Sequence, residues 1–413
     1  MSPVDVGNRG GATLSGARPD ARARVFAAMA QSGPISRAEL ARRSALAPST
    51  VGTVISELQA EGLVVEPTAT LDPPDRPTMG RPPVLVALHR KAGVALGIDL
   101  GHQHVRVALV DLSHAVIAER VQQIDRGLPA GDAIPLIARL VRQALADGEV
   151  DDPELRGVGM GFPGPVHRQS GTVLDSTILP GWVDVHGGQA MSAALGHHVE
   201  IENDANLGAL SEWMWGAGRG ADNLVYLKLA TGIGAGLILN GEPYVGTTGV
   251  AGEIGHTVIE PGGPICKCGN RGCIATLAGS PAILAALRPS YGDRLTLTEA
   301  ITLALAGDPG CKRAIEDAAR SVGVAVATLC NLLNPTRIVV GGELSAAGAL
   351  LLDPVKAAVG RAAIRSAADG VEVVQGQLGE RAQVLGAVAL ILRQARVTIQ
   401  TRPTGSPLVH KGR

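Results

Sequence analysis

The spacing of apolar residues divides this chain into two regions. Over 20–62 apolar side chains recur every three or four positions, which predicts three helices separated by Gly33-Pro34 and by a turn at Leu46-Ala47. Over 91–395 short apolar runs bounded by glycine alternate with helical stretches, as buried strands and helices do in an α/β protein. The pattern therefore predicts a small helical unit followed by a larger α/β unit.

The second and third predicted helices have the signals of a helix-turn-helix. Ser36 and Glu39 have the S-x-x-E form of a capping box, and Pro48 suits the first turn of the third helix. The outward face of that third helix is small and uncharged, as suits a helix lying against DNA; it contains Ser49, Thr50, Gly52, Thr53 and Ser56. A small helical bundle without a role in DNA binding is the alternative interpretation.

Two short apolar runs, 63–65 and 84–87, flank the segment TLDPPDRPTMGRPP and predict the hairpin of a wing. Within it, Arg81 lies in a slim extended segment able to enter a minor groove, or is simply a linker charge. Five arginines can neutralise phosphates, namely Arg22, Arg24, Arg37, Arg42 and Arg43. We therefore predict a winged helix-turn-helix over 20–90, with DNA contacts from Arg37, Ser49, Thr50, Thr53 and Arg81.

Composition limits the classes of protein to which this chain can belong. A chain of 413 residues is too long for one ordinary core, and 37 basic residues nearly balance 38 acidic ones, so no overall charge directs it to nucleic acid or membrane. No apolar run reaches the ~18–20 residues of a membrane span, and the first residues lack the apolar core of a signal peptide, so we expect a cytoplasmic protein. We predict a disordered tail over residues 1–19 and a flexible tail over residues 398–413.

The strongest local motif is GHTVIEPGGPICKCGNRGC at 255–273. It spaces His256, Cys266, Cys268 and Cys273 as H-x9-C-x-C-x4-C. Three thiolates and one imidazole fill the four positions of a closed tetrahedral site, so the sequence predicts a structural zinc ion. Buried free cysteines are the alternative.

Other polar residues follow predicted strands. Asn203 and Asp204 come after an apolar strand and begin a helix, so their side chains can project where open α/β sheets hold ligands. Glu253 and His256, beside the cysteine loop, can face sugar hydroxyls. A glycine-rich turn can bring backbone N–H groups against an anion or simply connect two strands; it contains Thr231, Gly232 and Gly234.

Several of these motifs, in this order, resemble the ROK family. They are FPGPV at 162–166, LPGW at 179–182, ENDAN at 202–206, the glycine pattern from 231 through AGEIGH, and CKCGNRGC. The family contains bacterial sugar kinases and sugar-responsive repressors built on the two-lobed actin-like ATPase (ribonuclease H-like) fold. The winged helix-turn-helix ahead of it, joined by GRPP, is similar to the repressor branch. The resemblance implies lobe 1 over 91–200, lobe 2 with the zinc loop over 201–378, and a C-terminal helix over 379–397 that returns to lobe 1.

The resemblance also implies roles for individual residues. Asp204 corresponds to the kinase base that deprotonates the sugar hydroxyl. Asn203, Glu253 and His256 correspond to sugar contacts, with His256 also a zinc ligand. Residues that fall where the family holds ATP phosphates are Asp99, Gly101, Thr231, Gly232 and Gly234.

Departures from the family pattern point away from catalysis. Family kinases have D-x-G-G-T-K at the first phosphate loop, whereas here Asp99-Leu100-Gly101 is followed by His102-Gln103-His104. The second glycine, the hydroxyl and the lysine are absent, and phosphoryl transfer depends on such positioning. Ile178 and Ala275 also replace an Asn and a Glu that contact sugar in the family.

These observations predict a DNA-binding transcriptional regulator, most simply a repressor of carbohydrate genes, and not an enzyme. Its predicted partners are double-stranded operator DNA, a sugar or sugar phosphate effector, and further copies of itself in a homodimer or homotetramer. An ATP-dependent sugar kinase, which would use Asp204 as its base, is the main alternative. A regulator that no longer senses sugar is a third, because of Ile178 and Ala275.

Overall fold

The computed structural model describes most of the chain: residues 21–32, 34–66, 84–89, 92–112, 114–151, 155–167, 171–173, 179–183 and 185–401. Two compact units share it, one formed by residues up to Ala87 together with those from Arg396 on, and one formed by Leu88–Ala395. In the described ranges no helix is long and apolar enough to cross a membrane. The predictions for the 1–19 tail, Arg81, GRPP, Ile178 and residues 402–413 lie outside them.

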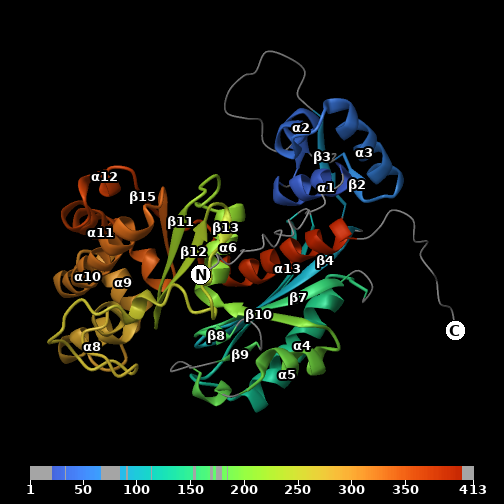
Figure 1. The fold of residues 1–413 in the computed structure, drawn as a ribbon. Helices are drawn as coiled ribbons and strands as arrows, with labels where there is room; N and C mark the ends of the chain where they lie inside the picture. Colours follow the sequence, from blue (N-terminus) through green and yellow to red (C-terminus); the bar gives the residue numbers. More distant parts are fainter. Residues whose placement is uncertain are drawn as a thin grey trace, which may run out of the picture. The chain divides into compact units, whose positions relative to one another are not determined.

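The N-terminal part of the first unit is made of helices and a small sheet (Figure 1). Its elements are α1 (Ala21–Ser32), β1 (Ile35–Ser36), α2 (Arg37–Ser44), α3 (Pro48–Ala60), β2 (Val64–Val65) and β3 (Leu85–Leu88), with strand order β1-β3-β2. Val51, Val54, Ile55 and Leu58 form the buried stripe of α3. The helices thus fit the predicted helix-turn-helix, and the short strand β1 is an element that the apolar pattern did not predict.

The capping box predicted for α2 is only half formed. Ser36 Oγ accepts a hydrogen bond from the Glu39 backbone N–H at 3.2 Å. The Glu39 carboxylate does not reach back to Ser36, because it pairs with Arg42 and Arg43 of the next turn. The hydrogen bond from Arg43 and the charges of both arginines lower the pKa of Glu39.

The second unit contains two five-stranded sheets with the same strand order (Figure 1). The sheet of lobe 1 has the order β10-β7-β4-β5-β6 and contains β4 (Val94–Leu100), β5 (His104–Asp111), β6 (Val116–Gln123), β7 (Leu155–Phe162) and β10 (Val199–Asn203). The sheet of lobe 2 has the order β13-β12-β11-β14-β15 and contains β11 (Leu224–Leu229), β12 (Ile233–Leu239), β13 (Glu242–Pro243), β14 (Arg337–Gly341) and β15 (Glu372–Gln375). In each, an antiparallel meander is extended by two parallel strands on the side of its first strand.

Helices fill the connections between strands. Lobe 1 has α4 (Ala130–Asp147) and α5 (Gly187–Leu195), together with the two-stranded ribbon of β8 (Val166–His167) and β9 (Thr172–Val173). Lobe 2 has α7 (Ala275–Ala278), α8 (Ser280–Tyr291), α9 (Leu297–Leu305), α10 (Pro309–Leu333), α11 (Ala349–Ala362) and α12 (Arg365–Ala368). Between β14 and α11 lies a 3-10 turn, Glu343–Ala347, which ends at Gly348, whose φ of 57° separates it from α11.

Two helices carry the contacts between the sheets. The helix α6 (Asp204–Trp215) follows β10 directly and packs on β11 and β12, so closely that a Cβ at Gly236 would lie 2.3 Å from the Ala205 carbonyl oxygen. The helix α13 (Ala382–Thr401), which extends beyond the predicted limit of 397, packs on lobe 1. A Cβ at Gly97 would lie 2.3 Å from Val384 O. The first residue of α6 therefore lies where the two lobes meet.

Candidate functional site

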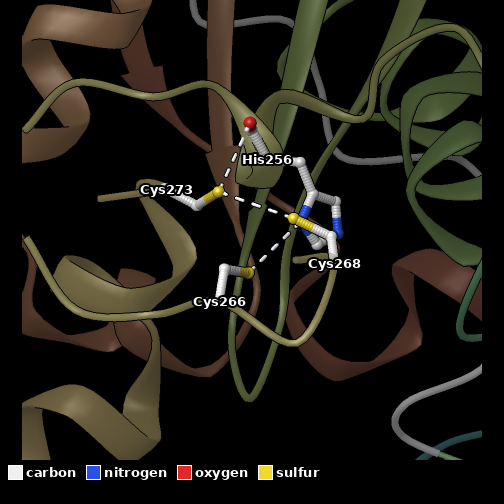
Figure 2. A group of neighbouring side chains, drawn as sticks. All are labelled: His256, Cys266, Cys268 and Cys273. Atoms are coloured by element: carbon white, nitrogen blue, oxygen red, sulfur yellow. Dashed lines mark hydrogen bonds between the residues drawn. The ribbon is translucent and has the colours of Figure 1, made fainter. Parts of the chain in front are cut away.

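The four predicted metal ligands lie together in the structure. One ligand atom from each of His256, Cys266, Cys268 and Cys273 lies within 4.8 Å of all the others. Cys266 Sγ is 3.6 Å from His256 Nδ1, and Cys268 Sγ is 3.7 Å from Cys273 Sγ (Figure 2). Tetrahedral zinc with bonds of ~2.0–2.3 Å needs ligand atoms about 3.3–3.8 Å apart. The donor set and its spacing therefore fit a metal ion of this kind.

Two glycines allow the cysteine loop to turn around the cluster of four ligand atoms. Gly269 and Gly272 have φ of 90° and 63°, and a Cβ at Gly272 would lie 1.6 Å from Glu260 O. A backbone hydrogen bond from Asn270 leads the interactions that lower the pKa of Cys268 to about 7. A lowered pKa favours the thiolate form that metal binding requires.

The predicted first phosphate loop is occupied by one of its own side chains. Asp99 is buried near the end of β4, and its Oδ2 is 2.9 Å from His104 Nε2. The His104 ring lies against the loop backbone, because a Cβ at Gly101 would be 2.2 Å from its Cε1. An imidazole thus stands where the resemblance implies a phosphate group.

Asp204 has a partner that the sequence reasoning missed, Lys228 of β11. The Lys228 ammonium group contacts Asp204 Oδ2 directly. Burial raises the pKa of Asp204, and the charge of Lys228 counteracts that rise. Burial opposes the charge of Lys228 as well, but the Asp204 and Asp99 carboxylates outweigh it and raise the pKa of Lys228. A lone lysine within the apolar run NLVYLKLA was the available signal, since a buried charge needs a partner.

Asn203 fixes the corner that presents Asp204. Its Oδ1 accepts hydrogen bonds from the backbone N–H groups of Ala205 and Asn206, at 2.9 and 3.3 Å, so it caps α6. Its Nδ2 donates to Gly164 O at 2.9 Å. These bonds account for Asn203 structurally, and its contact with a sugar stays a prediction.

The remaining predicted ligand-binding residues lie around the start of β12. Thr231 and Gly232 form the tight turn before this strand, closed by a hydrogen bond from Ala230 N to Gly232 O at 3.1 Å. Half-buried Glu253 precedes the 3-10 turn η4 (Ile254–His256), which packs on β12. A Cβ at Gly255 would lie 2.2 Å from Ile233 O. The structure therefore places the glycine-rich turn and the base of the metal loop on the same strand; their ligand contacts remain predictions.

On the first unit, the predicted DNA-facing side chains of α3 are accessible. Ser49 and Thr53 are exposed and Thr50 is half-buried, with Thr53 Oγ1 donating to Ser49 O at 3.2 Å. The arginines are engaged within the unit. Arg37 pairs with Glu66 at 3.1 Å, and the others contact Glu39, Glu61 or the carbonyl groups of Ser44 and Ala45. Arg37 would have to exchange an exposed ion pair for a phosphate, an exchange that costs little.

Comparison with known proteins identifies the family of the second unit. The ROK family description matches residues 95–394. The chain is 29% identical over 371 residues to the xylose repressor of Caldicellulosiruptor bescii, covering 87% of this chain and 92% of that protein. It is 34% identical over 315 residues to the glucokinase of Thermotoga maritima, covering 72% of this chain and 96% of that protein.

Among solved structures, a ROK family transcriptional regulator described as a homologue of the E. coli MLC protein matches with a TM-score of 0.72 and 26% identity. The match covers 92% of this chain and 99% of that one. The duplicated sheets thus form the two-lobed actin-like fold, preceded by a helix-turn-helix unit. The family match, the cysteine loop and this architecture together show that the chain belongs to the ROK family.

Proposed function

We propose that this protein is a DNA-binding transcriptional repressor of carbohydrate genes, and that its ROK domain binds a sugar or sugar phosphate. The coverage of the two kinds of relative supports this most directly. The match to the xylose repressor extends over 87% of the chain, whereas the match to the glucokinase covers 72%, about the share that the ROK domain occupies. The difference is close to the length of the helix-turn-helix unit, which a kinase does not need.

The first unit supplies the contact with DNA. The predicted DNA-facing residues of α3 are small and uncharged, so this helix can approach base edges closely. Arg37 would contact the phosphates. Arg81, which lies outside the described residues, would enter the minor groove. One such module buries too little surface for strong specific binding, so the proposed assembly is a homodimer or homotetramer on paired half-sites. Closure of the two lobes around the effector would then change the affinity for operator DNA.

The metal loop supports the second lobe. We propose a structural zinc ion held by His256, Cys266, Cys268 and Cys273, because all four tetrahedral positions are taken by protein. His256 would then fix one wall of the effector pocket. Asn203, Asp204 and Glu253 are the other proposed sugar contacts.

Fluorescence anisotropy on DNA from the gene's own upstream region, against scrambled DNA at two salt concentrations, tests the proposal. We expect specific binding that one member of a panel of sugars and sugar phosphates alters. Thr53→Glu places a negative charge on the outward face of α3 and should weaken specific binding by at least about tenfold.

Thr302→Glu is the matched control, since Thr302 is also exposed and also donates its hydroxyl to the carbonyl group four residues earlier. It lies on α9 of the ROK domain and should leave DNA binding unchanged. Equal binding to operator and scrambled DNA, or equal effects of the two variants, would contradict the proposal.

An ATP-dependent sugar kinase is the competing function, favoured by the identity to a glucokinase and by the presence of Asp204. Release of ADP over the same sugar panel distinguishes the two. We expect none, because Asp99 is paired with His104 and Asp204 with Lys228. Turnover that Asp204→Asn abolishes would establish the kinase.

A further inference from the structure

The duplicated fold places Asp99 and Lys228 at equivalent positions. The antiparallel hairpin of lobe 1 ends with the residue pair that contains Leu100, and the hairpin of lobe 2 ends with the pair that contains Leu229. Asp99 and Lys228 each precede that final residue by one. The same place in the two lobes therefore carries a carboxylate in one and an ammonium group in the other.

Glycines beside both residues leave room for their side chains to turn toward the junction of the lobes. Asp99 pairs with Gly161 on the neighbouring parallel strand β7, and Lys228 pairs with Gly341 on β14. On its other side Lys228 pairs with Gly234. A Cβ at Gly161 would lie 3.6 Å from Asp99 Oδ1, so the carboxylate lies beside this glycine.

Charges gather at this junction with little access to water. The side chains of Asp99, Asp204 and Lys228 are 4%, 9% and 21% exposed. Lys228 contacts Asp204 directly, and the charge of Asp99 acts on both members of the pair. Buried carboxylates require compensating positive charge, which an organic cation or a metal ion can supply.

We infer that Lys228 is an internal cation that takes the place of a divalent metal ion at Asp99 and Asp204, so that the proposed effector site at this junction binds its ligand without such a metal. Carboxylate oxygens are the ligands that Mg²⁺ and Mn²⁺ prefer, and Asp99 near the end of β4 and Asp204 just after β10 follow the two strands that flank β7. The Lys228 ammonium group occupies the Asp204 oxygen and repels a second cation. Lys228 is thus a specificity residue of the proposed effector site, and this inference does not depend on the binding of DNA.

Titration of the zinc-loaded full-length protein with Mn²⁺, followed by the electron paramagnetic resonance signal of free Mn²⁺, tests the inference. We expect the wild-type protein to bind no Mn²⁺ at Asp99 and Asp204. Lys228→Met should create a site that binds Mn²⁺ at least about tenfold more tightly than any wild-type site. Lys228→Arg keeps the positive charge and should not.

Two controls separate this site from others. Lys312→Met removes the lysine 3.9 Å from Glu316 on the surface of α10, and should create no site. Lys228→Met combined with Asp204→Asn should lose the new Mn²⁺ site, whereas the zinc ion at the cysteine loop should be retained.

Lys228→Gln serves as a second neutral variant if Lys228→Met does not fold, as judged by circular dichroism. Wild-type Mn²⁺ binding that Asp204→Asn abolishes would overturn the inference. So would folded neutral variants that bind Mn²⁺ no better than the wild-type protein. DNA binding measured on the same samples reports separately on the proposed function.

Discussion

The hairpin of lobe 1, β4–β5, and the hairpin of lobe 2, β11–β12, have the same place in equivalent sheets and opposite chemistry. The turn of lobe 1 contains His102 and Gln103 and is overlaid by the His104 ring. The turn of lobe 2 contains only Ala230, Thr231 and Gly232. The duplicated backbone fixes where side chains emerge, and the residues chosen there decide whether a turn is open to an anion or filled by the protein.

The hairpins also differ in their support. The hairpin of lobe 2 is covered by the segment leading into the metal loop: a Cβ at Gly252 would lie 1.9 Å from Ala235 O of β12. The hairpin of lobe 1 packs on α4 and, through Gly97, on α13. Changes that affect one hairpin and not the other therefore test whether the lobes are independent in stability.

The largest effect is expected from loss of the metal. Cys273→Ser removes one of four donors, so the protein should lose its zinc, and the free energy that protects β11–β12 from opening should fall by about 5 kcal/mol or more. The hairpin β4–β5 should keep its protection. Zinc content per chain and hydrogen exchange resolved by peptide measure the two effects.

Cys330→Ser provides the comparison, since Cys330 is equally buried, on α10, and is not part of the cluster. It should retain a full complement of zinc. Retention of zinc by Cys273→Ser, or equal loosening of both hairpins, would show that the metal loop does not support lobe 2 selectively.

A smaller effect is expected from Asp204→Asn, which leaves the Lys228 ammonium group without its partner. Breaking one side of a buried ion pair costs about 3–5 kcal/mol. Asp369→Asn breaks an exposed pair with Arg365, 3.8 Å apart, and should cost less than about 1 kcal/mol. Chemical denaturation at pH 7 compares the two variants.

The same variant should reverse the pH dependence of stability due to Lys228. In the wild-type protein the pKa of Lys228 is raised, so its contribution is fully present at neutral pH and is lost only as the pH rises through that raised pKa. Without Asp204, burial should depress the pKa of Lys228. The unfolded chain then binds more protons, and stability should increase from pH 7 to pH 9. A flat profile in Asp204→Asn would mean that Asp99 alone holds the charge.

The smallest effect is expected from His104→Ala in the turn of lobe 1. Loss of its hydrogen bond to Asp99 should lower the free energy of unfolding by about 1 kcal/mol. Binding of a non-hydrolysable ATP analogue should not appear, because the glycine, hydroxyl and lysine of a phosphate loop are still missing. His198→Ala, which breaks an exposed pair with Glu200, should leave stability unchanged. Tight nucleotide binding by His104→Ala would show that the ring alone closes the turn.

Much of the fold could be predicted because its strands are buried apolar runs ended by glycine. One such apolar run is strand β4, Val94–Leu100, between Gly93 and Gly101, and the metal cluster followed from the spacing of His256 and three cysteines. These features are local. The contact of Lys228 with Asp204 was not predictable. It depends on how α6, which follows β10 of lobe 1, packs on β11 of lobe 2, and the spacing of residues along the sequence does not give the distance between these two elements.

The partners of the arginines were missed for the same reason. Arg22 and Glu61 are 39 residues apart and meet only because α1 and α3 pack together. The contacts of the predicted DNA and sugar residues with their ligands remain predictions, because their accessibility and geometry permit these contacts without requiring them.

The junction helix α6 has a further consequence for experiment. Two of the three tryptophans of the chain, Trp213 and Trp215, lie in its last turn, and the Arg393 guanidinium of α13 lies 5.6 Å from the centre of the Trp213 ring. The third, Trp182, is buried in lobe 1 against Phe162. A rotation of α6 against α13 would change the contact between Arg393 and Trp213 and so the quenching of indole emission. Since Asp204 is the first residue of α6, a ligand bound at Asp204 could cause such a rotation. The intrinsic fluorescence of the protein thus reports on the movement of α6 without any attached dye.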